Sequence, residues 1–229
     1  MRRVAARKKR AVKASVSTKA ALGFRSHSGW AALVVVAGPP HEPNVVDRRR
    51  IEIADPAIPG SKQPYHAAER WPLAKADEYL NRCISKTRLL TRQAVSAVVN
   101  DLREKGLDVV GCGLLGASGR PFTTLAATLA SHALIHTAEG ELFRNALIEA
   151  SEHCDLPVTK VTERELYARG AADLGMSVEE LRNRIIELGR PVGPPWTQDE
   201  KHAALIGWMV LAAAPRRSVR PFRRTRQGQ

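Results

Sequence analysis

Long apolar runs separated by short polar turns dominate the first quarter of the sequence. Residues 19–24 and 30–37 are almost continuously apolar, and the polar residues 25–29 between them predict a hairpin turn. After a proline-rich turn, residues 44–55 alternate apolar and charged positions in their second half, which predicts a third strand. Three consecutive strands joined by short turns are typical of an antiparallel meander.

Helical periodicity dominates the rest of the chain. A proline-rich loop over residues 56–64 precedes a predicted helix over residues 73–105, which ends at Gly106, a typical C-cap residue. The next elements are expected to be a buried strand, a helical region that Gly140 divides, and a short strand, over residues 107–115, 123–154 and 156–161. Hydroxyl–glutamate pairs three residues apart predict capping boxes at three later helix starts, namely Thr162 with Glu165, Ser177 with Glu180, and Thr197 with Glu200.

This order of elements indicates an α/β fold. A meander followed by two helix-to-strand crossovers gives a mixed sheet, with three antiparallel strands, further parallel strands, and helices on its faces. We expect a single domain over residues 18–214, a basic disordered arm over residues 1–17 and an Arg-rich disordered tail over residues 215–229.

Basic residues are concentrated at the two ends of the sequence. The net charge is +13, from 36 basic and 23 acidic residues. Residues 1–20 hold eight Lys or Arg and residues 215–229 hold six Arg, without an acid in either segment, so residues 21–214 carry a net charge of about −1. Such segments favour DNA or RNA through counterion release, without sequence preference. A solubility or assembly tail, or an organelle transit peptide at the N-terminus, is an alternative interpretation. The segments include Arg2, Arg3, Arg223 and Arg224.

Two global features bear on the compartment and the partners. Cys83, Cys112 and Cys154 are odd in number and lie in no metal-binding spacing, which favours a reducing compartment without disulfides. No stretch approaches the roughly 18 apolar residues that a membrane span needs. We therefore expect a cytoplasmic protein without a membrane partner, and the sequence predicts no particular oligomeric state.

Two short stretches resemble the ribonuclease H-like superfamily, and in particular its RuvC-like resolvases. Residues 22–31 (LGFRSHSGWA) are similar to the first hairpin of that family, and residues 199–205 (DEKHAAL) are similar to its final helix. The resemblance implies a ribonuclease H-like fold and a nucleic-acid partner. It also implies Mg²⁺ or Mn²⁺ held by carboxylates on the first strand, near the end of the fourth strand and on the last helix. Of these positions only Asp199, with His202, matches. Arg25, or Phe24 if the turn shifts by one residue, falls at the first-strand position, and residues 107–115 end without an acid.

The resemblance implies a nucleic-acid-associated domain, either a metal-dependent nuclease with an atypical site or a non-catalytic binding or assembly module that has lost the carboxylates. A small-molecule enzyme is a third hypothesis. His132, His136 and Glu139 follow at i, i+4 and i+7, so they share one helix face and offer two imidazoles and a carboxylate to a metal ion or a reaction. A polar stripe beside a packed helix would show the same spacing.

A glycine motif adds two further candidates. Gly111, Gly113 and Gly116 spell G-x-G-x-x-G after an apolar strand, as in dinucleotide-binding turns, although Pro121 falls inside the helix that should follow. The loop after that strand is a candidate phosphate site, because glycine-loop amides and a guanidinium bind anions. Its residues are Ser118, Gly119 and Arg120, with Arg25 as a further candidate.

Overall fold

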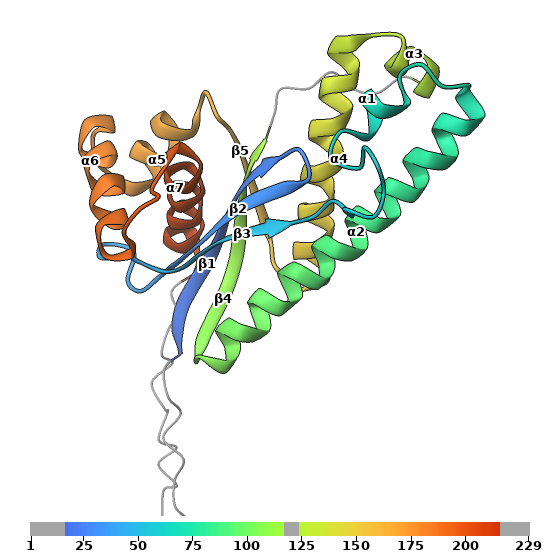
Figure 1. Ribbon diagram of the computed structural model, residues 1–229. Helices are drawn as coiled ribbons and strands as arrows, with labels where there is room; N and C mark the ends of the chain where they lie inside the picture. The colour runs from blue at the N-terminus through green and yellow to red at the C-terminus, as the bar shows by residue number, and fades with distance from the viewer. Residues whose placement is uncertain (1–16, 117–123, 216–229) are drawn as a thin grey trace, which may run out of the picture.

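A central five-stranded mixed sheet with helices on both faces forms the protein (Figure 1). The computed structural model describes residues 17–116 and 124–215. The strand order is β3-β2-β1-β4-β5. The predicted α/β class, with an antiparallel meander extended by parallel strands, is therefore confirmed.

The strand directions place three strand ends at one edge of the sheet. β1 (Thr18–His27) pairs antiparallel with β2 (Trp30–Ala37) and parallel with β4 (Leu107–Gly116). β3 (Asn44–Glu52) adds to β2 in antiparallel orientation, and β5 (Val158–Thr162) adds to β4 in parallel orientation. The C-terminal ends of β1, β4 and β5 consequently meet at the same edge, where open α/β sheets bind ligands.

The first hairpin is tighter than the sequence pattern suggests. β1 continues to His27, which pairs with Trp30, so Ser28 and Gly29 alone form the turn. Gly29 has a φ of 81°, a conformation that glycine adopts without strain. The prediction of a turn over residues 25–29 was wrong. Polar side chains also occur within a strand where one of its faces is not covered by the core. Here Arg25 and His27 are strand residues on one face of β1.

Helices cover the two faces of the sheet (Figure 1). α2 (Leu73–Glu104) and α4 (His132–His153) pack on one face. α5 (Leu166–Leu174), α6 (Val178–Gly189) and α7 (Gln198–Ala213) pack on the other.

Successive residues of the central strands alternate between the two hydrophobic cores. Leu22 and Phe24 of β1 join the core under α2 and α4, whereas Ala21 joins the core under α7. β2 behaves in the same way, which explains why both strands read as continuous apolar runs rather than as alternating ones. α7 lies so close to the sheet that a Cβ added at Gly23 would come within 1.8 Å of the Ala203 carbonyl oxygen.

Three helix boundaries differ from the predicted ones. The proline-rich loop ends in a short helix, α1 (Pro64–Ala68). The second helical region divides between α3 (Leu125–Leu129) and α4, since Ser131 is extended, whereas Gly140 continues the helix. A 3₁₀ turn, η1 (Arg190–Val192), follows α6.

Of the three predicted capping boxes, one forms completely. Thr197 and Glu200 cap α7 reciprocally, and Ser177 caps α6 by accepting a hydrogen bond from the Glu180 amide. Thr162 instead contacts the Glu165 carboxylate, and α5 begins only after Glu165. The box fails there because Glu165 itself occupies the N-cap position.

Two further predictions concern cysteines and membranes. All three cysteines are free, and Cys83 and Cys112 are buried. Burial raises the pKa of Cys112 to about 11. Among the described helices, none combines the length and the apolar character needed to cross a bilayer.

Candidate functional site

Five polar side chains from three elements meet at the edge where the parallel strands end. Arg25 and His27 come from β1, Glu163 directly follows β5, and Asp199 and His202 come from the first turns of α7. We call this group the sheet-end cluster. The resemblance implied a site shared by the first strand and the last helix, and these two elements do lie side by side here.

Arg25 bridges the two carboxylates of the sheet-end cluster. Its Nη1 donates to Glu163 Oε2 at 2.5 Å, and its Nε lies 3.6 Å from Asp199 Oδ1. His27 Nε2 lies 3.0 Å from the same Asp199 oxygen, close enough for an ion pair when the ring is protonated. Hydrogen bonding to Arg25 lowers the pKa of Glu163, so this carboxylate is ionised over a wide pH range.

His202 is the buried member of the cluster. Its residue is 3% exposed, its Nε2 contacts the Gln198 side chain, and its Nδ1 lies 3.9 Å from Glu163 Oε1. Burial lowers the pKa of His202, and the nearby Arg25 charge lowers it further. The imidazole is therefore neutral at pH 7.

Local structure explains why these side chains converge. The capping box at Thr197 starts α7 so that Asp199 lies in its first turn, facing β1. The His27 ring stacks on Trp30, its partner across the hairpin, with centroids 4.2 Å apart and planes 10° from parallel. The Arg50 guanidinium also lies over Trp30, 3.8 Å from the ring centroid. These contacts hold His27 toward α7.

The sheet-end cluster is an ion-pair network centred on Arg25. Within residues 17–116 and 124–215, three His, Cys, Asp or Glu ligand atoms lie within 4.8 Å of one another in one group, and that group is not the sheet-end cluster. Arg25 stands between the two carboxylates, and a guanidinium repels a divalent cation. Three buried nitrogens, Arg25 Nε, His27 Nε2 and His202 Nδ1, make no hydrogen bond of regular geometry to the described residues.

The group with metal-ligand geometry lies elsewhere, between α1 and α4. It consists of His66, His132 and His136. His132 Nε2 and His136 Nε2 are 3.1 Å apart. Glu139, predicted to share their face, is buried and contacts the Nδ1 atom of the same His66 ring at 2.8 Å. The i, i+4 pair is therefore brought together as predicted, and a third histidine from another element completes it.

The glycine motif belongs to β4. Gly111, Gly113 and Gly116 all lie within the strand rather than in a strand-to-helix turn. A Cβ at Gly113 would come within 2.6 Å of Ile206 on α7, so this glycine permits close packing of the helix. The dinucleotide interpretation was wrong. That motif needs its glycines in the turn between a strand and a helix, whereas these glycines have the extended backbone of β4. The candidate phosphate residues Ser118, Gly119 and Arg120 lie outside the described residues.

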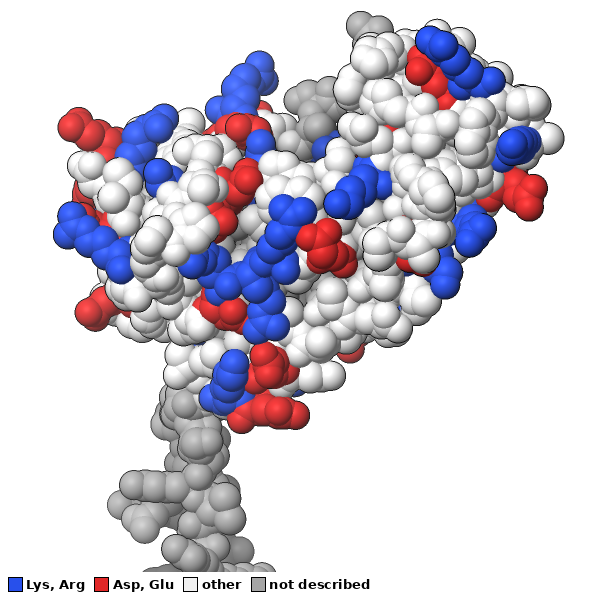
Figure 2. Space-filling view, in the orientation of Figure 1, with Lys and Arg blue, Asp and Glu red and all other residues white. Residues whose placement is uncertain are grey.

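The residues next to the two basic segments lie together. The Lys19 ammonium group donates to the carbonyl oxygen of Pro215. Thr18 begins β1 and His27 ends it, so this junction is about 30 Å from the sheet-end cluster at a rise of about 3.3 Å per residue. Arg2, Arg3, Arg223 and Arg224 lie outside the described residues. On the face shown in Figure 2, basic and acidic side chains of the described residues are interspersed.

Three members of these sites, namely His27, Glu163 and His66, were not identified as site residues from the sequence. Glu163 lies two residues after the predicted strand over residues 156–161, and a carboxylate at a strand end is a usable signal. His66 lies in a proline-rich segment without periodicity, so no local pattern indicates that it faces α4.

Solved structures of RuvC from Thermus thermophilus are similar to this chain. One, described as RuvC in complex with a Holliday junction substrate, is 12% identical, with a TM-score of 0.48, and the match covers 83% of this chain and 91% of that chain. Another RuvC structure from the same organism is 13% identical, with the same TM-score, and the match covers 83% of this chain and 92% of that chain. This is a weak resemblance of fold. No protein-family profile matches the chain, and no curated protein sequence matches it.

Proposed function

We propose that the protein binds the phosphate backbone of DNA or RNA, and that its two basic segments act together. The observation that carries the proposal is the contact between Lys19 and Pro215, which places the starting points of both segments side by side. Residues 1–17 and 216–229 together hold thirteen Lys or Arg and no acid, whereas residues 18–215 between them have a net charge of about 0.

Two linked cationic segments bind a polyanion more strongly than either does alone. Once one segment is bound, the second acts at a high effective concentration, because their attachment points are adjacent. Each phosphate that is neutralised releases condensed counterions, so affinity falls steeply with salt concentration. The near-neutral charge of the domain, with its interspersed surface charges, favours the segments over the domain as the main phosphate-binding element.

Fluorescence anisotropy over a salt series tests the proposal with the full chain. In one variant, glutamine replaces the six arginines at positions 216, 217, 220, 223, 224 and 226. We expect weaker binding to a labelled 20-base-pair duplex. The slope of log K against log salt concentration should become shallower by up to about 5, at about 0.9 per lost phosphate contact.

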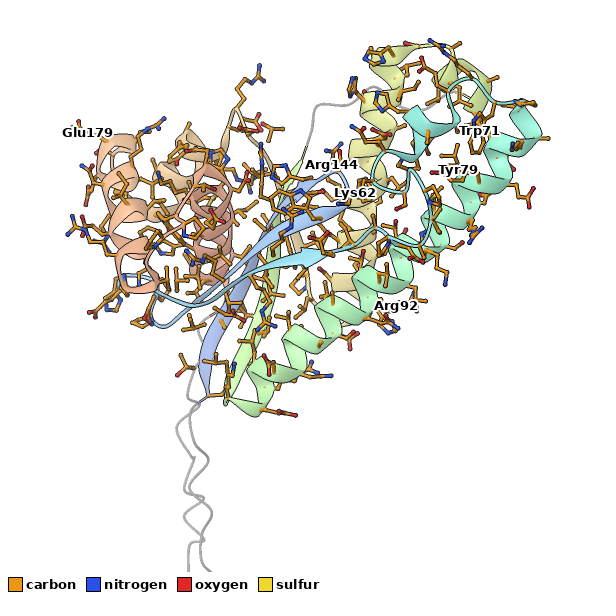
Figure 3. All side chains as sticks on the ribbon, in the orientation of Figure 1. Lys62, Trp71, Tyr79, Arg92, Arg144 and Glu179 are labelled. Atoms are coloured by element: carbon orange, nitrogen blue, oxygen red, sulfur yellow. The ribbon has the colours of Figure 1, made fainter. Side chains whose placement is uncertain are left out.

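A matched control removes the same charge from the folded surface. Helix α2 carries six exposed basic residues suitable for replacement by glutamine, and these are Lys75, Arg82, Lys86, Arg88, Arg92 and Arg103 (Arg92 is labelled in Figure 3). We expect this control to retain most of the affinity and the slope. An equal loss in both variants would show that net charge, not the segments, drives binding. Absence of binding by the unaltered chain would refute the function itself.

The sheet-end cluster favours binding without metal-dependent cleavage. Two-metal hydrolysis needs carboxylates free to share two cations, whereas here Arg25 bridges Glu163 and Asp199. The position implied for the first catalytic carboxylate thus carries a positive charge. We propose that the protein is a non-catalytic binding module, in which Arg25, Glu163 and Asp199 form an ion-pair network beside a neutral His202.

Cleavage assays on duplex, branched and single-stranded substrates with Mg²⁺ or Mn²⁺ test this second part. We expect no divalent-dependent product from the unaltered chain. Cleavage that disappears in Asp199→Asn would assign the cluster a nuclease role. Cleavage that persists in that variant would point to a contaminant or to another site. Binding in the anisotropy assay is a separate readout, so either part of the proposal can fail alone.

A further inference from the structure

We infer that His66, His132 and His136 bind one divalent transition-metal ion of the zinc class. The three histidines lie on two elements, α1 and α4, that are separate in sequence. One ring nitrogen from each lies within 4.8 Å of the others, and this is the only such trio of His, Cys, Asp or Glu within the described ranges. Three imidazoles are a ligand set that suits zinc, copper, nickel and cobalt ions.

The spacing of the ring nitrogens suits one small ion. In a tetrahedral zinc site with bonds of 2.0–2.1 Å, neighbouring ligand nitrogens are about 3.3 Å apart. His132 Nε2 and His136 Nε2, one turn apart on α4, are 3.1 Å apart. The His66 ring lies against both, with centroid separations of 5.2 Å and 4.7 Å. Both α4 histidines are exposed, so small ring rotations can complete the coordination without moving the core.

Glu139 orients the third histidine. Its Oε2 lies 2.8 Å from His66 Nδ1, and its Oε1 accepts a hydrogen bond from the His66 backbone amide at 3.1 Å. When His66 Nδ1 donates its proton to Glu139 Oε2, the lone pair of Nε2 is available to a metal. A metal-binding histidine commonly donates its other ring N–H to a carboxylate in this way.

The burial of Glu139 makes this contact informative. The residue is 3% exposed, and a buried carboxylate is costly unless both oxygens are satisfied. Among the described residues, Oε1 accepts from the His66 backbone amide and Oε2 contacts the His66 ring. Anchoring α1 would require only the backbone amide, whereas the second contact fixes the ring itself. The ring that is fixed in this way has one nitrogen within 4.8 Å of a ring nitrogen of each exposed histidine.

The proposed site is accessible from outside. Three protein nitrogens leave a fourth position of a tetrahedral ion open to water or another ligand. His66 also lines an open groove of about 800 Å³ that extends past Lys62 to Ser28. Figure 3 shows Lys62 beside the β1–β2 turn, and Tyr79, whose hydroxyl donates to Pro59, near the start of α2. Residues 56–67 form most of the groove wall. A metal bound by His66, His132 and His136 would therefore tie this segment to α4.

Metal titration of the full, chelator-stripped chain tests the inference. Zn²⁺ is titrated against a chromophoric competitor, and Co²⁺ is followed by its visible absorption, which reports tetrahedral coordination. We expect one equivalent per chain. His136→Ala and His66→Ala should each abolish stoichiometric binding at micromolar metal, and Glu139→Gln should weaken affinity about 10–100-fold.

His153→Ala is the matched control, because His153 is an exposed histidine at the other end of α4. Its affinity should equal that of the unaltered chain. Unchanged affinity in His66→Ala would overturn the three-histidine site and leave only chelation by the α4 pair. Equal binding by the unaltered chain and His136→Ala would overturn the site entirely. If Glu139→Gln fails to fold, the comparison of His136→Ala with His153→Ala remains decisive, since both positions are exposed.

Discussion

The close approach of α7 to β1 predicts a severe effect of Gly23→Ala. The added Cβ would lie 1.8 Å from the Ala203 carbonyl oxygen, 2.7 Å from its carbonyl carbon and 3.0 Å from the Gly207 nitrogen. All three are backbone atoms, so no side-chain rotation relieves the clash. An uncrowded carbon contact needs about 3.5 Å, so strand and helix must separate locally by about 1.7 Å.

Overpacking of a rigid core costs about 1–3 kcal/mol, and sometimes more. The lower entropy of the unfolded alanine chain offsets about 0.4–1 kcal/mol of this cost. Because the clash is with backbone atoms, we place the cost at the upper end, about 3 kcal/mol, and expect Gly23→Ala to lower the free energy of unfolding by about 2–2.6 kcal/mol, measured by urea denaturation followed by circular dichroism. Because Ala203 adjoins His202, the same displacement should separate α7 from Arg25 and His27.

Gly207→Ala is the control on the opposite side of this contact. Its Cβ would lie 3.3 Å from the Gly23 nitrogen and 3.4 Å from Val36 Cγ2, which is tight but requires only small adjustments. Alanine also stabilises a helix interior by about 1 kcal/mol relative to glycine. We expect this variant to stay within about 1 kcal/mol of the unaltered protein. A loss below 1 kcal/mol in Gly23→Ala, or equal losses in both variants, would refute the packing argument.

Two further predictions concern α7. The pKa of His202 is lower in the folded protein than its ordinary value of 6.5, so below pH 6.5 the unfolded chain binds more protons. The free energy of unfolding should fall as the pH drops from about 6.5 toward the folded pKa, and His202→Gln should flatten this dependence in urea titrations at pH 5 and 7.5. Thr197→Ala removes the capping box and should lower the unfolding free energy by about 1 kcal/mol, with Thr197→Ser retaining most of it. An unchanged denaturation midpoint in Thr197→Ala would contradict this role of the cap.

Local patterns in the sequence were enough to predict the class of the fold. The continuous apolar runs of β1 and β2 arise because both faces of a central strand are buried, and this requirement is visible residue by residue. The apolar period of α2 predicted its limits to within one residue. The charge partition also needed no structure, because counting Lys and Arg along the chain reveals both basic segments.

The composition of both side-chain clusters depended on contacts between residues far apart in the sequence. Arg25 meets Asp199 because the end of β1 and the start of α7 lie at the same edge of the sheet. His66 meets α4 because the segment before α2 packs against α4. Local periodicity specifies which face of an element is buried, but not which neighbour it faces. Register and packing supply that information. They bring α7 so close to β1 that a Cβ built at Gly23 would lie 1.8 Å from the Ala203 carbonyl oxygen. The two basic segments likewise share an origin only because β1 begins where α7 ends.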